Sequence, residues 1–138
     1  MKKLFVDTNI VIDLLAKRNP FYREAANLFS LADNGGVELA TSSLTIANTH
    51  YVLQRQIDPG KAKQILRKLR LIISILPLNE KLIDLALNDQ TFPDFEDALQ
   101  YFSALEFQQN LIITRNLRDF KQADLPVMTA DQFMESLR

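Results

Sequence analysis

Short apolar runs alternate with longer stretches of mixed polarity along this chain. Each run suits a strand of a parallel sheet that is buried on both faces, because such a strand needs no polar side. Four strands are predicted, with a smaller edge strand near the C-terminus, at residues 4–6, 37–40, 72–76, 111–114 and 127–128.

The segments between these runs carry apolar residues at the three- and four-residue spacing of helices. Thr8 and Asn9 are suitable caps for the first helix, Pro20 begins the second, and Gly35 and Gly36 end it. Asp58, Pro59 and Gly60 are typical of a turn. Residues 41–43 are predicted to cap a third helix that ends at about residue 56. The remaining helices are predicted at residues 61–71, 80–89, 94–109 and 131–137, with one helical turn at 116–120.

Strands that alternate with helices pair in parallel through crossover connections. The predicted fold is therefore α/β, a three-layer α/β/α sandwich around a short central parallel sheet of four to five strands. The chain has 138 residues, of which 47% are hydrophobic, and it contains no repeat or low-complexity linker. We expect one domain that spans residues 1–138.

The amino-acid composition excludes several kinds of functional site. The absence of cysteine excludes disulfides, thiolate metal sites and cysteine nucleophiles, and a single histidine excludes the usual zinc site. The apolar run before Asp7 is too short for an export signal, and no stretch approaches the roughly 20 apolar residues of a membrane span. We therefore expect a cytoplasmic protein without a membrane partner. Its net charge of −1 lacks a general basic excess, so any contact with nucleic acid must be local.

Polar residues lie where the predicted strands end, which is where open parallel sheets bind ligands. Asp7 ends the first strand, Thr114 ends the fourth, and Asn116 and Asp119 follow it. Asp97 lies near the start of the helix that leads into the fourth strand. If the first and fourth strands are neighbours, these acids gather at one edge and repel one another. Mg²⁺ or Mn²⁺ would neutralise them, activate water and balance the charge of a scissile phosphate.

Each acid also has a structural interpretation. An aspartate after a buried strand often caps the next helix, although Thr8 or Asn9 can serve here instead of Asp7. Asp97 lies in the first helical turn, where acids favour the helix dipole, and Asp119 suits a turn. The joint pattern therefore carries more weight than any single acid.

That joint pattern resembles the PIN-domain nucleases. The resemblance rests on Val6-Asp7-Thr8-Asn9, on the segment from Asp94 to Gln100 and on the segment from Leu111 to Phe120, in that order. It runs from Lys3 to about Phe120, and residues 126–133 also fit. The most similar group is that of small stand-alone bacterial PIN proteins, which includes the VapC-type toxins of toxin–antitoxin pairs.

The resemblance implies a Mg²⁺- or Mn²⁺-dependent ribonuclease, which often forms a homodimer and is inhibited by a small antitoxin. By position, Asp7, Asp97 and Asp119 match the catalytic metal ligands, with Asn116 as a polar ligand beside them. The small polar positions that orient ligands and water correspond to Thr8, Asn9 and Thr114.

One position departs from the family. Its second acid, usually a glutamate on the third helix, is replaced here by Asn48, which lacks charge. Asp94 is the expected substitute metal ligand, because it shares a helix face with Asp97. Glu96 is expected to point elsewhere, at about 100° per residue around the helix. The alternative function is therefore a catalytically weakened PIN-like module that binds RNA or a protein.

Basic residues and the remaining polar residues complete the prediction. Arg115 and Arg118 flank the proposed site and are the expected contacts for RNA phosphates. Asp13 is expected to be a capping or surface acid, and His50 to have a packing or surface role. The basic residues between positions 61 and 70 are interpreted as a solvated helix face, with tracking of a phosphate backbone as the alternative.

Overall fold

The computed structural model describes all residues from 1 to 138. Its centre is a five-stranded sheet in the order β3-β2-β1-β4-β5, and every neighbouring pair is parallel. The strands are β1 (Lys3–Val6), β2 (Glu38–Ser42), β3 (Ile73–Leu76), β4 (Leu111–Ile113) and β5 (Val127–Met128). The predicted α/β sandwich is confirmed. Since Val6 pairs with Ile113, the carboxyl ends of β1 and β4 are neighbours, as the expected acidic cluster requires.

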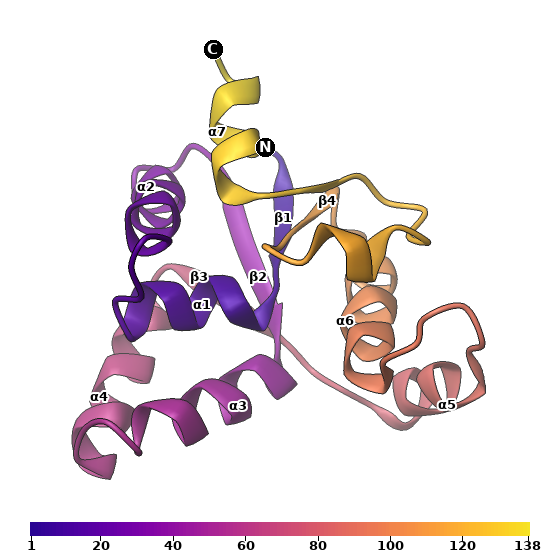
Figure 1. The fold of residues 1–138 in the computed structure, drawn as a ribbon, viewed down its shortest axis with the longest axis horizontal. Helices are drawn as coiled ribbons and strands as arrows, with labels where there is room; N and C mark the ends of the chain where they lie inside the picture. Colours follow the sequence, from indigo (N-terminus) through magenta and orange to yellow (C-terminus); the bar gives the residue numbers. More distant parts are fainter.

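Helices cover both faces of the sheet (Figure 1). One face packs against α1 (Thr8–Leu15), α2 (Tyr22–Asp33), α4 (Pro59–Leu69) and α7 (Ala130–Ser136), with α3 (Ser43–Leu53) against α1 and α4. The other face packs against α5 (Glu80–Asn88), α6 (Phe95–Glu106) and the 3₁₀ helix η1 (Leu117–Phe120). None of these helices has the length and apolar character needed to cross a membrane.

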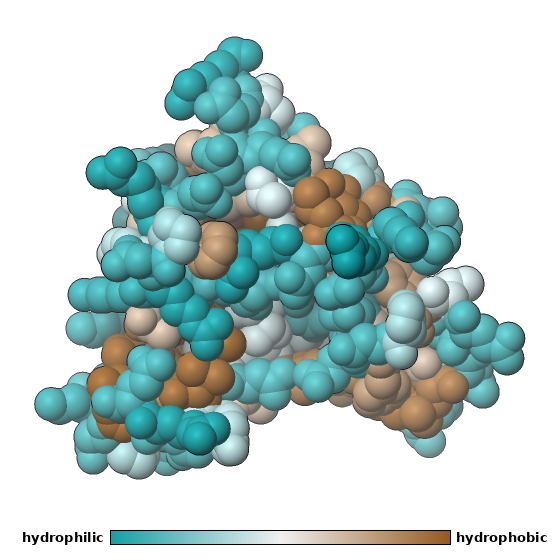
Figure 2. Space-filling model, in the orientation of Figure 1, coloured by the Kyte–Doolittle hydropathy of each residue, from teal (hydrophilic) through white to brown (hydrophobic).

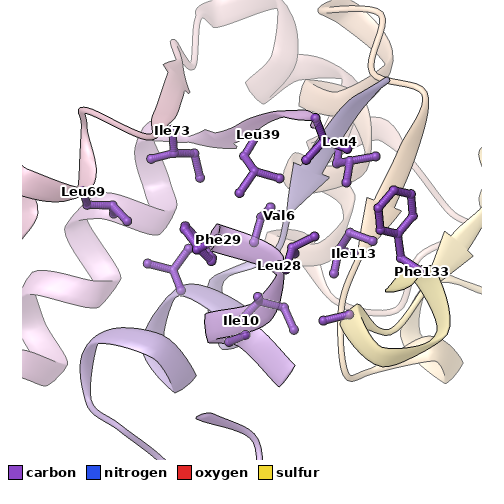
Figure 3. Packing of buried hydrophobic residues seen from close by; sticks show 14 of the residues in the cluster. Leu4, Val6, Ile10, Leu28, Phe29, Leu39, Leu69, Ile73, Ile113 and Phe133 are labelled. Atoms are coloured by element: carbon purple, nitrogen blue, oxygen red, sulfur yellow. The ribbon is translucent and has the colours of Figure 1, made fainter. Parts of the chain in front are cut away.

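Successive side chains of the central strands point to opposite faces of the sheet, so the hydrophobic core has two parts. Leu4 and Val6 of β1 enter the larger apolar cluster, with Phe29 and Phe133, as Figure 3 shows. Phe5 points to the opposite face and enters the smaller cluster beneath α6. The side chains of Leu4, Phe5 and Val6 are all fully buried. Because β1 is packed on both faces, its position and direction in the sheet are fixed, and so is the position of Asp7, which follows it.

Side-chain caps correct three predicted boundaries. Asp7, rather than Thr8 or Asn9, caps α1, because its carboxylate accepts the backbone N–H of Thr8. The expected turn at residues 58–60 is the start of α4, with Asp58 as the cap and Pro59 in the first turn. A backbone N–H there would have no partner within the helix, so proline is tolerated. Strand β2 continues past its predicted end to Ser42, which pairs with Leu76 and also caps α3, within the predicted capping segment 41–43.

The surface is mainly hydrophilic on the face drawn in Figure 2, with hydrophobic patches near α4 and near α5. The five basic side chains of the α4 segment are all exposed, at positions 61, 63, 67, 68 and 70. Large apolar residues are exposed at Leu71, Leu85, Leu87, Phe95 and Leu105.

Candidate active site

A polar cavity of about 260 Å³ lies at the carboxyl end of the sheet, between the starts of α1, α3 and α6. Four carboxylates and one guanidinium line it, so its charge is strongly negative. The lining residues are Asp7, Thr8, Asn9, Ile12, Arg18, Leu44, Asn48, Asp94, Glu96, Asp97, Gln100 and Asn116.

Asp7 is the anchor of this cavity, and only 6% of it is exposed. Its Oδ1 accepts the backbone N–H of Thr8 at 2.8 Å and the side-chain amide of Gln100 at 3.2 Å. Its Oδ2 accepts the Thr114 hydroxyl at 2.8 Å and, more weakly, the Asn9 amide at 3.4 Å. Four donors on two oxygens fix the carboxylate in one orientation. The long hydrogen bond from Asn9 is the weakest of the four, so a bound ligand would displace it most easily.

The direction of the Thr114 hydrogen bond follows from its other partners. Thr114 Oγ1 accepts the Asn116 backbone N–H at 3.1 Å and the Asn9 amide at 3.2 Å. Its single proton is therefore free to point to Asp7, which as a carboxylate can only accept. In this way Thr114, directly after β4, favours the charged form of Asp7, directly after β1.

Gln100 is an organising residue that sequence reasoning missed. It is buried on α6, its Oε1 accepts the Ser42 hydroxyl, and its Nε2 donates to Asp7 and to Thr45 Oγ1 at 2.9 Å. Thr45 in turn shares a 2.9 Å hydrogen bond with Thr8. A glutamine one turn beyond Asp97 and the polar start of the third helix were the only signals in the sequence. The network ties β2, α3 and α6 to the Asp7 carboxylate.

Two carboxylates of the cavity, Asp7 and Asp97, have raised pKa values. Burial raises the pKa of Asp7, against the hydrogen bonds from Thr114, Thr8 and Gln100, and the charge of Asp119 raises it further. Partial burial raises the pKa of Asp97 to about 7, and the charges of Asp94, Asp7, Asp119 and Glu96 add to this effect. Both shifts mean that the cavity disfavours negative charge unless a positive group balances it.

Asp119 lies beside this cavity rather than in it. It is exposed on η1 and lines a neighbouring cavity with Arg118, although its charge reaches both Asp7 and Asp97. No three acidic or histidine side chains come close enough together to hold one metal ion. The structure thus brings Asp7, Asp94, Asp97 and Asn116 to one cavity, but leaves Asp119 at its edge. The lone histidine, His50, does not line either cavity.

The first turn of α6 corrects the prediction for Glu96. Asp94 caps this helix by accepting the Glu96 backbone N–H at 2.8 Å, and it lines the cavity as expected. Glu96 was expected to point elsewhere, and that is wrong. Its longer side chain lines the same cavity and accepts a hydrogen bond from the Asn48 amide at 3.0 Å.

Asp13 and Arg115 form an ion pair that the sequence did not indicate. Arg115 Nε donates to Asp13 Oδ2 at 2.6 Å and Nη2 donates to Oδ1 at 3.1 Å. Asp13 is only 1% exposed, so its expected place at the surface is wrong. The same guanidinium lies 3.8 Å from the centre of the Phe21 ring. Arg115 therefore joins β4 to α1 and α2, whereas Arg118 is exposed and forms no ion pair.

Arg18 is the one basic residue that lines the cavity, and sequence reasoning missed it as well. Its backbone N–H donates to the Asp13 carbonyl and its own carbonyl accepts the Tyr22 N–H, which turns the chain between α1 and α2. Its guanidinium is exposed and forms no ion pair with the nearby acids. No motif marks this arginine, because only the turn after α1 carries it to the cavity.

The donor set of the cavity is the one that hard divalent cations prefer. Carboxylate, amide and hydroxyl oxygens suit Mg²⁺ and Mn²⁺, and no softer ligand is present. A cation would also oppose the repulsion that raises the Asp97 pKa. The residues present therefore fit such an ion, with Asp7 and Asp97 as the central pair.

A parallel sheet with an acidic cavity at the carboxyl ends of its strands defines an α/β domain built to handle a charged ligand. The chain matches the family model described as the PIN domain over residues 3–118. It therefore belongs to the PIN domain family. A comparison with curated protein sequences finds no match.

Solved structures show the same fold. A toxin–antitoxin complex from Klebsiella pneumoniae is similar with a TM-score of 0.69 and 24% identity, covering 92% of this chain and 97% of the other. VapBC-1 from nontypeable Haemophilus influenzae gives 0.68 and 18%, covering 94% and 98%. The sarcin–ricin loop cleaving toxin VapC20 of Mycobacterium tuberculosis gives 0.62 and 18%, covering 79% and 86%. At these identities the likeness establishes the fold.

Proposed function

We propose that this PIN-domain chain is a Mg²⁺- or Mn²⁺-dependent endoribonuclease that serves as the toxin of a toxin–antitoxin pair. The observation that carries the proposal is the pair of carboxylates, Asp7 and Asp97, which face one acidic cavity from the end of β1 and the start of α6. The fold supports it, since several similar structures are toxins or toxin–antitoxin complexes.

Asp7 and Asp97 are sufficient as direct protein ligands. Magnesium usually keeps several waters and is held by one or two carboxylates together with substrate phosphates. Asp119, Asp94 and Asn116 then contribute through water or through their charge and dipoles. When bound, the cation supplies activation of water and neutralisation of charge at the scissile phosphate. The hydrogen bonds from Thr114, Gln100 and the Thr8 N–H orient Asp7 and oppose the rise in its pKa that burial causes.

RNA contact is assigned to basic residues that have no partner in the protein. Arg18 lines the cavity and can reach a phosphate held there, and Arg118 lies beside Asp119 in the neighbouring cavity. A guanidinium suits this role because its planar set of N–H donors matches phosphate oxygens. Arg115 is bound to Asp13 instead. Two local arginines are consistent with a chain whose net charge is only −1.

The proposed partners are RNA, a small antitoxin protein and a second copy of the chain, in the cytoplasm. Complexes described as VapBC or FitAcB support the antitoxin, although their identity to this chain is 18–19%. Expression of the chain alone should arrest bacterial growth, and co-expression of a small protein encoded in the neighbouring reading frame should restore it. Growth that is unaffected by the chain, with the purified protein active, would refute the toxin role alone.

The nuclease proposal is tested with purified protein, Mn²⁺ and a mixed pool of end-labelled RNA. We expect cleavage by the wild type that is lost with chelator and falls by at least about a hundredfold in Asp7→Asn and Asp97→Asn, because each removes a carboxylate from the ion. Asp84→Asn, an exposed acid on α5, is the matched control and should remain active. Cleavage that survives Asp7→Asn belongs to a contaminant. Binding of Mn²⁺ and RNA without cleavage would instead identify a weakened binding module.

A further inference from the structure

Asn48 and Glu96 form a bridge across the mouth of the cavity. Asn48 lies on α3 and Glu96 in the first turn of α6, yet the Asn48 Nδ2 donates to Glu96 Oε1 at 3.0 Å. Both residues line the cavity that contains Asp7 and Asp97. The bridge is therefore part of the candidate site rather than a contact elsewhere on the surface.

The chemistry of this bridge is directional. An ionised carboxylate only accepts hydrogen bonds, so a glutamate at position 48 would repel Glu96, whereas the amide of Asn48 donates to it. The amide occupies Oε1 and leaves Oε2 of Glu96 without a partner, and Glu96 takes part in no ion pair. Asn48 thus holds a charged oxygen at the cavity without neutralising it.

This arrangement explains how the site retains an acid although position 48 carries none. Asn48 supplies position and hydrogen bonding, and Glu96 supplies the charge from the facing helix. The pair delivers one carboxylate to the cavity, as a single glutamate at position 48 would.

We propose that Glu96 is a further carboxylate of the cation site, which acts on the divalent cation by its charge and through metal-bound water, and that Asn48 is the positioning residue that directs it. This inference rests on the proposed metal-dependent function. It assigns to Glu96 the role that sequence reasoning gave to Asp94, whose Oδ1 is already engaged as the cap of α6.

Titration of the full-length protein with Mn²⁺, followed by calorimetry and by the electron paramagnetic resonance of the free ion, tests the assignment without reference to activity. Glu96→Gln should weaken Mn²⁺ binding by about tenfold or more, and Asn48→Ala should weaken it in the same direction. Glu80→Gln is the matched control, because Glu80 is also an exposed acid in the first turn of a helix but lies on α5, outside the cavity. Its Mn²⁺ affinity should equal that of the wild type.

The exchanged double variant Asn48→Glu/Glu96→Gln separates a role in cation binding from a merely structural one. It reverses donor and acceptor but keeps one carboxylate and one amide, so Mn²⁺ affinity should return to within about threefold of the wild type. If Glu96→Gln binds Mn²⁺ as tightly as Glu80→Gln does, while Asp7→Asn has lost binding, Glu96 has no part in cation binding and the proposed function stands. If the wild type itself binds no Mn²⁺, the proposed function fails, and this inference fails with it.

Discussion

Replacement of Arg115 by methionine tests whether this arginine is structural. The substitution removes both hydrogen bonds to the buried Asp13 but leaves a flexible apolar chain against Phe21. Loss of one partner from a buried ion pair costs about 3–5 kcal/mol, and since the Arg115 side chain is 26% exposed we expect about 2–3 kcal/mol. The unfolding entropy of a chain of 138 residues is roughly 0.3 kcal/mol per kelvin, so Tm should fall by about 7–10 °C.

Thermal unfolding followed by far-ultraviolet circular dichroism measures this change. Arg118→Met is the matched control, because Arg118 is exposed and unpaired, and it should shift Tm by less than about 2 °C. The double variant Asp13→Leu/Arg115→Met should regain most of the lost stability, since it leaves no buried charge unpaired. A Tm for Arg115→Met within 2 °C or so of the Arg118→Met value would refute the reasoning and make Arg115 available for RNA.

Three further predictions concern the cavity. With chelator present, Asp97→Asn should be more stable than the wild type at pH 8 but not at pH 4. The reason is that the Asp97 carboxyl, with a pKa of about 7, contributes stability that is lost as pH rises through that value. Urea unfolding at both pH values measures the difference, and an equal effect at both contradicts the prediction. Arg18→Ala, in an Asp7→Asn background, should weaken RNA binding and lower the salt slope by about one, with a salt slope equal to that of the parent as the contrary result. Gln100→Leu should cost about 1–3 kcal/mol and weaken Mn²⁺ binding, because it removes a donor to Asp7 and leaves the Ser42 hydroxyl without its acceptor; unchanged stability and Mn²⁺ affinity would show that the network does not support the site.

The sequence by itself determined the elements and their order. Burial on both faces makes β1 and β4 continuously apolar, and the apolar spacing of the helices is a property of each segment alone, so both were visible without the fold. Parallel pairing then placed Asp7 at the end of β1 and Asp97 near the start of α6, at the same edge of the sheet. These two positions depend on strand ends and helix starts, which local patterns mark.

Only the tertiary structure decided which side chains meet. Glu96 was misplaced because a helical angle describes direction around one axis, whereas its partner Asn48 lies on another helix. Arg115 and Arg18 gained their places from the packing and turns of α1 and α2, and no spacing in the sequence encodes a contact between residues 13 and 115. Local periodicity fixes which face a residue occupies, but the distance between two faces is set by how the helices pack on the sheet, and that packing determines the composition of the site.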